Sequence, residues 1–304
     1  MSDSAVRRFE RLASEPMISS GGSVGLRGTW GSLRAVFAHR ELLGLLVRRD
    51  IKARYKDSVL GMLWTLINPI VQLLVYYLVM GQILGAAKGL DEFAIYVFSG
   101  LTIYGLFSEI LSGSTGSIVA NSGLVKKVYV PREVFPLASV GSALFTFSVQ
   151  LLVLIVACFI VGSPPLSVNL IYAIPSILLV VVYAGAFGIL FAALNVYLRD
   201  VQYLTGIVLM LAMWASPIVY GWGMVQDVIA RFNLPGWLLE VYTSNPLTLA
   251  VLGFHRAFWM AGGPEDYPAG MAVRMAIAFV IGVTLFWICQ RVFARLQGNF
   301  AQEL

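Results

Sequence analysis

The stretch that decides the fold is RRDIKARYKDSVLGMLWTLINPI, residues 48–70. Five of its first nine residues are basic, and most of the residues after Asp57 are apolar. Around the charged part, apolar residues recur every four positions from Leu43 to Tyr55, while the basic side chains fall largely on the other side of a helix. The stretch therefore predicts an amphipathic helix over about residues 40–57, which lies at a membrane surface and leads into a membrane span.

The composition of the whole chain is that of an integral membrane protein. Of its 304 residues, 59% are hydrophobic and only 12% are charged, and the mean hydropathy is +0.81. Soluble domains have about 25% charged residues. Residues 1–57 carry 11 of the 21 Lys and Arg together with six acids, so we expect a basic solvated arm and no nucleic-acid partner.

Several apolar segments approach or exceed the length of about 20 residues that a helix needs to cross the hydrocarbon core. They are continuous apolar runs, which favours helices over the alternating strands of a barrel. The sequence therefore predicts an all-α integral membrane fold with six transmembrane helices after the amphipathic interface helix. The predicted spans are residues 59–85, 93–118, 134–162, 168–198, 202–221 and 270–294.

The connections between these spans predict the orientation of the chain. Seventeen Lys and Arg fall on the side of the N-terminus and four on the other side, which makes both termini cytoplasmic by the positive-inside rule. The long connection 222–269 then lies outside, and we expect it to form short re-entrant or gate helices at the outer interface. No signal peptide is visible, and residues 1–34 are expected to be a flexible cytoplasmic segment.

The sequence lacks the common motifs of catalysis. It has no GxxxxGK[ST], HExxH or GxSxG pattern, and LSGST at 111–115 lies inside a predicted span. Cys158 and Cys289 have no metal-ligand spacing, and His39 and His255 are predicted on opposite sides of the membrane. We therefore expect no catalytic residues, no metal site and no cofactor in this chain.

Three features each allow two interpretations. Asn68 and Pro69 predict a helix bend, which marks either a substrate path or a packing adjustment. Glu109, inside the second span, either pairs with a hydroxyl or basic neighbour or faces a polar conduit. The many aromatic residues of the spans form either interface belts and packing contacts or the wall of a conduit that suits sugar rings.

Four separate pieces of the sequence resemble one family in the same order and spacing. They are residues 48–70, SIVANSGLVKKVYVPREVFP at 117–136, SPIVYG at 216–221, and SNPLTLAVLGFHRAFW at 244–259. They are similar to the membrane subunits of type-2 ABC polysaccharide exporters, the Wzm and TagG group, and within it to exporters of cell-wall galactan. The likeness covers about residues 35–300, which are therefore expected to form one transmembrane domain.

The resemblance implies a function and a set of partners. Members of this group export O-antigen, capsule, teichoic acid or galactan chains on a polyprenyl diphosphate carrier across the bacterial cytoplasmic membrane. Two copies form the pore, and two separate P-loop ATPase subunits bind ATP and Mg. The interface helix is expected to contact the ATPase and membrane lipid, with the lipid diphosphate as a competing partner. Its candidate residues are Arg48, Arg49, Lys52, Arg54 and Lys56.

The resemblance also implies a coupling element and a conduit. The cytoplasmic loop 119–133 is expected to insert a short coupling helix into a groove of the ATPase. Its candidate contact residues are Asn121, Leu124, Lys126, Lys127, Tyr129, Pro131, Arg132 and Glu133. The conduit is expected along the first and fifth spans of each copy. Its candidate residues, which include the acid of the second span, are Trp64, Asn68, Tyr76, Tyr77, Glu109, Tyr203, Met213, Trp214 and Tyr220.

Other classes of function compete with a polysaccharide exporter. The permease of a type-2 ABC drug or lipid exporter would lack the interface helix, and an ion-coupled secondary carrier would depend on Glu109. A membrane glycosyltransferase or flippase-like enzyme needs clustered acids at one membrane face, whereas the cytoplasmic acids here are scattered. The sequence leaves open the identity and length of the glycan, the pore-facing residues and the resting state of the gate.

Overall fold

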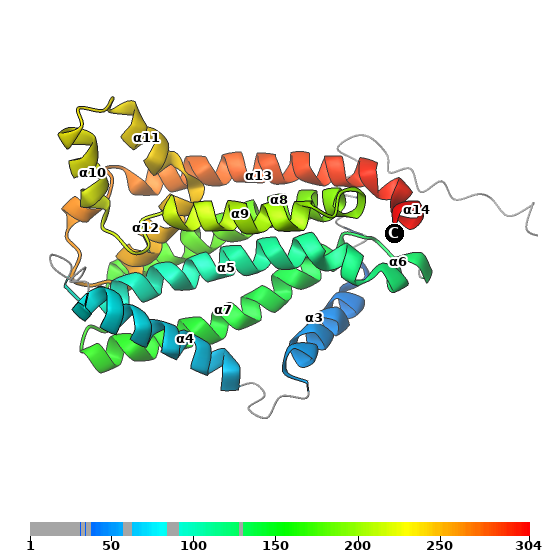
Figure 1. Cartoon of the computed structure of the whole chain (residues 1–304), viewed down its shortest axis with the longest axis horizontal. Helices are drawn as coiled ribbons and strands as arrows, with labels where there is room; N and C mark the ends of the chain where they lie inside the picture. The colour runs from blue at the N-terminus through cyan, green and yellow to red at the C-terminus, as the bar shows by residue number, and fades with distance from the viewer. Residues whose placement is uncertain (1–30, 32–33, 35–37, 57–62, 84–90, 128–129) are drawn as a thin grey trace, which may run out of the picture.

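The computed structural model describes residues 31, 34, 38–56, 63–83, 91–127 and 130–304. These residues form a bundle of helices whose long axes run in one general direction, and the described ranges contain no strand (Figure 1). All but two of the residues 1–34 lie outside the described part, so the expectation for that segment stays a prediction.

Four long helices build the body of the bundle and agree with four predicted spans to within two residues. Each is long and apolar enough to cross a membrane. The central pair, α5 and α8, is the more buried, and α7 and α13 present apolar side chains outward. These helices are α5 Phe93–Ala120, α7 Val134–Val161, α8 Ala173–Tyr197, which the 3-10 turn η3 Val168–Tyr172 precedes, and α13 Met271–Leu296.

Small and hydroxyl residues let the central helices approach closely, as is common in membrane bundles. A Cβ atom on Gly188 of α8 would lie 2.7 Å from the Cβ of Ser114 in α5, so only glycine fits there. The Asn195 side chain of α8 donates a 3.1 Å hydrogen bond to the carbonyl of Thr115. These contacts fix the depth at which α8 lies against α5.

The first predicted span is described over residues 63–83. The helix α4 Trp64–Val75, whose 12 residues rise about 18 Å, continues into the π-helix η2 Tyr76–Ile83. Pro69 lies inside α4 and does not end it. Residues 59–62 and 84–85 of the predicted span are outside the described part.

The fifth predicted span is wrong in its second half. The helix α9 Val201–Trp214 ends seven residues before the predicted boundary at 221, and residues 215–220 form turns and bends. Fourteen residues rise about 21 Å, less than the hydrocarbon core of about 30 Å. Pro217 cannot donate a backbone hydrogen bond, and the hydroxyl of Tyr96 contacts the carbonyls of Pro217 at 3.0 Å and Tyr220 at 2.8 Å. In the described part of the chain four helices are long and apolar enough to span a membrane by themselves, and the first and fifth predicted spans contain the shorter apolar helices Trp64–Val79 and Val201–Trp214.

The two ends of the bundle differ (Figure 1). At one end lie the short helices α10 Trp222–Arg231, α11 Trp237–Ser244 and α12 Pro246–Phe258, followed by the 3-10 turn η4 Pro264–Asp266. At the other end lie α3 Arg40–Tyr55, α6 Ser122–Lys127, the 3-10 turn η5 Gln297–Asn299 and α14 Phe300–Glu303. Most of α12 is buried and packs against α5 and α8, so this helix enters the bundle rather than lying flat on its end.

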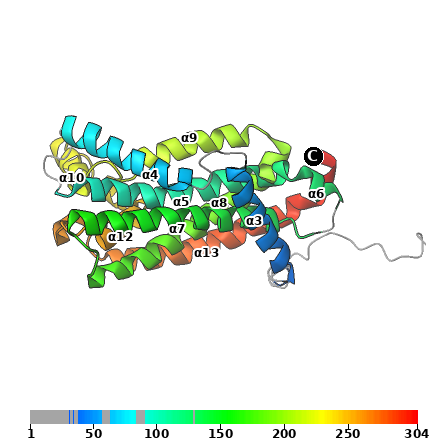
Figure 2. The same ribbon diagram turned by 90° about the horizontal axis from the view of Figure 1, so that it is seen from below.

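The helix α3 crosses the bundle obliquely and packs against α7 (Figure 2). Leu46 is buried, and Leu43 and Val47 are partly buried, while the basic residues are exposed. A Cβ atom on Gly141 of α7 would lie 2.7 Å from a methyl of Val47, so α3 is seated directly on this glycine. The burial follows the amphipathic pattern predicted for residues 40–57.

Candidate functional site

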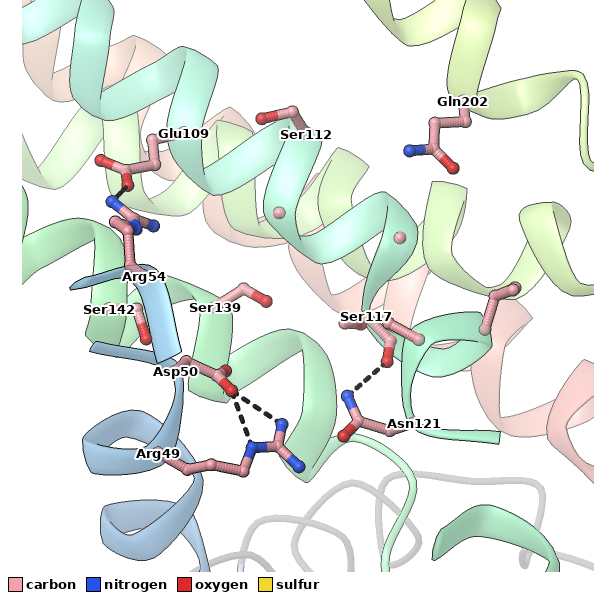
Figure 3. Close-up of a pocket in the computed structure, with 14 residues that line it drawn as sticks. Arg49, Asp50, Arg54, Glu109, Ser112, Ser117, Asn121, Ser139, Ser142 and Gln202 are labelled. Atoms are coloured by element: carbon pink, nitrogen blue, oxygen red, sulfur yellow. Dashed lines mark hydrogen bonds and ion pairs between the residues drawn. The ribbon is translucent and has the colours of Figure 1, made fainter. Parts of the chain in front are cut away.

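A polar pocket of about 730 Å³ lies where α3 meets α5 and α7, near the end that carries α6 (Figure 3). Small and polar side chains form most of its wall, and Gln202 of α9 completes it. This lining contrasts with the apolar surface of the long helices. The residues labelled in the close-up are Arg49, Asp50, Arg54, Glu109, Ser112, Ser117, Asn121, Ser139, Ser142 and Gln202.

An ion pair crosses the pocket from the surface helix to the bundle. The Nη1 atom of Arg54 in α3 contacts the Oε1 atom of Glu109 in α5. The same nitrogen lies 2.9 Å from the hydroxyl of Thr146 in α7, and this hydroxyl lies 3.2 Å from Glu109 Oε1. One carboxylate therefore joins three helices, and Glu109 has both the basic and the hydroxyl neighbour that one of its two interpretations required.

The second arginine of the pocket is also paired. The guanidinium of Arg49 lies 2.7 Å from Asp50 Oδ1 in the same helix. Both arginines that line the pocket therefore have their charge balanced by a carboxylate of this chain. The exposed bases of α3 and its C-cap without an ion pair in the described part are Arg40, Arg48, Lys52 and Lys56. These four are the cations that this helix presents to an outside anion.

The predicted coupling segment contains a short helix, α6. Val125 of α6 is buried against the bundle, whereas Leu124, Lys126 and Lys127 are exposed. The side chain of Asn121, at the end of α5, donates a 2.8 Å hydrogen bond to the Ser117 carbonyl and closes that helix. The helix thus presents one apolar and two basic side chains outward. Tyr129 lies outside the described residues.

The end of the predicted coupling segment faces inward. Glu133 is only 5% exposed, and Pro131 is partly buried. The guanidinium of Arg132 lies over the ring of Phe300, 5.6 Å from its centre. The contact of Arg132 fastens the segment to the C-terminal helix, and Pro131 and Glu133 are turned inward, so the exposed lysines are the stronger candidates for contact with a partner.

The C-terminal helix α14 packs against α6, a contact that no pattern in the sequence indicated. Phe300 is fully buried and packs on Phe293 and Tyr197, with ring centres 5.6 and 6.1 Å apart. The hydroxyl of Tyr197 donates a 2.8 Å hydrogen bond to the Leu296 carbonyl, which ties α8 to the end of α13. The ring of Phe300 thus lies between the bundle and the coupling segment.

The conduit candidates fall into two groups. Trp64, Asn68, Tyr77, Tyr203 and Trp214 are exposed on α4, η2 and α9. The helices α4 and α9 lie on the upper side of the bundle in Figure 2. A second group, Tyr76, Met213 and Tyr220, is partly buried against the main core. Glu109 belongs to neither group, because it faces α3 in the polar pocket.

Tyr220 forms hydrogen bonds at the end of the bundle that carries α10 to α12. Its hydroxyl donates a 2.7 Å bond to the Trp214 carbonyl and lies 3.2 Å from the hydroxyl of Tyr242 in α11. In the same region Glu240 of α11 accepts a 2.7 Å hydrogen bond from Arg274, which lowers the pKa of this carboxyl. Tyr220 therefore joins the end of α9 to the short helices.

A bundle of long apolar helices with a basic surface helix and a short exposed connecting helix at one end is the architecture of an integral membrane domain. The chain belongs to the ABC-2 type transporter family, whose model matches residues 41–259. It is therefore an integral membrane protein of the permease type. The match includes α3, the polar pocket, α6 and all three short helices of the opposite end.

The relatives of the chain are named as O-antigen export permeases and as a polysialic acid transport protein. The "O-antigen export system permease protein RfbA" of Myxococcus xanthus is 28% identical over 90% of this chain and 98% of its own length. A protein of the same name from Klebsiella pneumoniae is 27% identical over 87% of this chain and 95% of its own length. The "Polysialic acid transport protein KpsM" of Escherichia coli is 33% identical, but over 26% of this chain and 31% of its own length.

Proposed function

We propose that this chain is the transmembrane subunit of an ATP-driven exporter, which moves a polyprenyl-diphosphate-linked polysaccharide across the bacterial cytoplasmic membrane. The observation that carries this proposal is the nearly end-to-end similarity to two O-antigen export permeases, over 95% and 98% of their lengths. The substrate class is an O-antigen, teichoic-acid or galactan type of chain. The choice of galactan as a substrate rests on the likeness of the sequence motifs alone.

The energy source is a pair of separate ATPase subunits that hold ATP and Mg. Membership of the ABC-2 family supports such a partner, and the positive-inside rule places the end with α3, α6 and α14 in the cytoplasm. At this end α6 exposes Leu124, Lys126 and Lys127. An apolar side chain beside two cations suits a groove that has an apolar floor and an acidic rim.

The contacts of α3 provide a path from the ATPase to the bundle. This helix is seated on Gly141 of α7, and its Arg54 contacts Glu109 of α5 and Thr146 of α7. A displacement of α3 by the ATPase would therefore act on two spanning helices. Interfaces of this kind move as packed units rather than bending continuously.

A second copy of the chain completes the pore. Large apolar and aromatic side chains are exposed along α4, η2 and α9, and Tyr203 is 78% exposed. Exposed aromatic rings beside Asn68 suit the mixed apolar and polar faces of sugars. In this arrangement two copies face each other through these helices, and the glycan passes between them.

The proposal is tested in the native bacterium. Deletion of the gene should remove one polysaccharide from the cell surface and leave its polyprenyl-diphosphate-linked form in the cytoplasmic leaflet. The wild-type gene should restore export, and the double variant Lys126→Ala, Lys127→Ala should not. The matched control is Arg231→Ala, which removes an exposed cation at the opposite end. An unchanged surface glycan and no lipid-linked intermediate after deletion would refute the proposal.

A further inference from the structure

An apolar groove of about 600 Å³ lies between α8 and α13, at the end away from α6. Its wall is formed by side chains of η3, α8 and α13, and it includes Val168, Ile171, Leu178, Ala272, Ala276 and Phe279. A smaller cavity of about 350 Å³ adjoins it and shares Tyr172 and Arg256 with it. Neither cavity includes a residue of the polar pocket at the opposite end or a conduit candidate.

The surface on both sides of the groove is apolar. On both sides of it, the spanning helices expose large aliphatic side chains. Ile174 of α8 is 61% exposed and Val273 of α13 is 63% exposed. In a membrane protein such surfaces meet the acyl chains of the bilayer. The shape and lining of the groove therefore suit a hydrocarbon chain that runs along the two helices.

Arg256, in the last turn of α12, lies at the rim of this groove. Its guanidinium is 4.4 Å from the ring centre of Tyr172 and 5.5 Å from that of Tyr267. Its Nε atom makes a long hydrogen bond of 3.4 Å to Asn169 Oδ1. The two rings hold the guanidinium by cation–π contact, so little side-chain freedom remains to be lost when a ligand binds.

Arg256 forms no ion pair in the described part of the chain. Within the described part of the chain its side chain has no carboxylate within ion-pair distance and no hydrogen bond other than that to Asn169. The nearby Asp266 instead accepts a 2.8 Å hydrogen bond from the backbone of Gly263. A partly exposed, pre-positioned arginine beside an apolar groove is thus complementary to an amphiphile with an anionic head.

We propose that this groove binds an anionic phospholipid from the membrane leaflet at the α10–α12 end. One acyl chain lies along α8 and α13, and the phosphate accepts hydrogen bonds from the terminal nitrogens of Arg256. Guanidinium and phosphate match in geometry and charge, and the contact is strengthened near hydrocarbon. The site requires only that the chain lies in a membrane, so it stands or falls separately from the proposed export function.

The test is a lipid titration of the full-length chain in detergent, followed by native mass spectrometry. The wild-type protein should hold one phosphatidylglycerol molecule more tightly than phosphatidylcholine. Arg256→Gln should raise the Kd for phosphatidylglycerol about tenfold, because it removes charge-assisted hydrogen bonds. The matched control is Arg231→Gln in α10, which removes an exposed cation at the same end, and it should leave the Kd within about twofold.

A second variant and a second probe separate a lipid site from a simple phosphate site. Ala276→Phe fills the groove from an exposed position, so it should weaken phosphatidylglycerol binding without unfolding the bundle. Soluble glycerol phosphate, which has the head but no acyl chain, should not bind at the same concentrations. The proposal is overturned if Arg256→Gln and Ala276→Phe both bind the lipid like the wild type, or if glycerol phosphate binds as tightly as the lipid. The assay contains no ATP and no glycan, so its failure leaves the export proposal intact.

Discussion

At the scale of single residues, Glu109 is the ionisable group whose surroundings are most informative. An acid inside a long apolar helix is costly unless it is paired. Here Arg54 and Thr146 supply one ionic and one hydroxyl partner, and the acid lies in a polar pocket rather than in hydrocarbon. This arrangement favours an ion pair that holds α3 on the bundle over a proton-carrying site.

The ion pair can be tested by exchanging its charges. Either Arg54→Glu or Glu109→Arg alone places two like charges together and should loosen α3, with a loss in stability of about 1 kcal/mol or less because the pair is partly exposed. The double exchange should restore both stability and export. Thermal unfolding in detergent and surface glycan levels are the measurements. Arg49→Gln, which breaks only a pair within α3, is the control and should change neither.

The contact between Gly141 and Val47 gives a second residue-scale prediction. Gly141→Leu places a side chain where a Cβ already lies 2.7 Å from Val47, so α3 has to move away from α7. We expect faster proteolysis within α3 and reduced export. Gly141→Ala should have a weaker effect, and combining it with Val47→Ala should reverse that effect. A combined variant no better than Gly141→Ala alone would show that α3 is not seated on this glycine.

At the scale of helices, hydropathy predicted four spans almost to the residue and failed where local chemistry overrode it. The apolar run 202–221 is uninterrupted by charge, but Pro217 and the hydrogen bonds of Tyr96 end the helix at Trp214. Tyr96 is about 120 residues away in the sequence, so a window of hydropathy values does not include it. For the buried α12 the sequence predicts only a short re-entrant or gate helix, because Pro246 and His255 interrupt its apolar residues.

The polar pocket, too, could be predicted only in part from the sequence. The amphipathic pattern predicted α3 and its basic face, and the small residues of α5 predicted close packing. Nothing in a single sequence pairs Arg54 with Glu109, 55 residues away, or brings Thr146 and Gln202 to the same place. Phe300 was missed because one aromatic residue near a C-terminus carries no periodicity.

The packing of Phe300 between the bundle and the coupling segment gives a prediction at the scale of elements. Phe300→Ala should create a cavity beside Arg132 and Phe293 and cost about 3 kcal/mol locally, so α6 loses its support. We expect weaker association with the ATPase and lower export, while the lipid titration stays unchanged. Phe300→Leu, which keeps most of the volume, is the matched control. Normal ATPase association in the alanine variant would show that α6 holds its position without the C-terminus.

At the scale of the whole molecule, the two ends and the two sides of the bundle have separate tasks. The end with α3, α6 and α14 carries most of the exposed bases and the polar pocket, and the opposite end carries the buried α12 and the short helices. The side with α4, η2 and α9 exposes four aromatic rings, those of Trp64, Tyr77, Tyr203 and Trp214, whereas α13 exposes aliphatic chains and one aromatic ring, that of Trp287. This division suits a permease that binds an ATPase at one end, contacts a second copy along one side and contacts lipid over the remaining surface.

The dimer face can be mapped by cysteine cross-linking in native membranes. A cysteine at Tyr203 or Ile207 of α9, both exposed, should form a disulfide-linked dimer on mild oxidation. A cysteine at Val280 of α13, which is 65% exposed, should not. The natural Cys158 and Cys289 are buried and provide the background. Cross-linking only through Val280 would place the partner on the wrong side for the proposed conduit.

The most direct test of the central claim is to purify the tagged chain from its native membrane in mild detergent and to measure both its partners and its ATP hydrolysis. The proposed exporter predicts a P-loop ATPase in equal amount, with hydrolysis that depends on Mg and association that weakens in the Lys126→Ala, Lys127→Ala variant. A stable chain that purifies without any ATPase and binds none when one is added would contradict the claim. That result would favour a carrier that works without ATP and depends on Glu109.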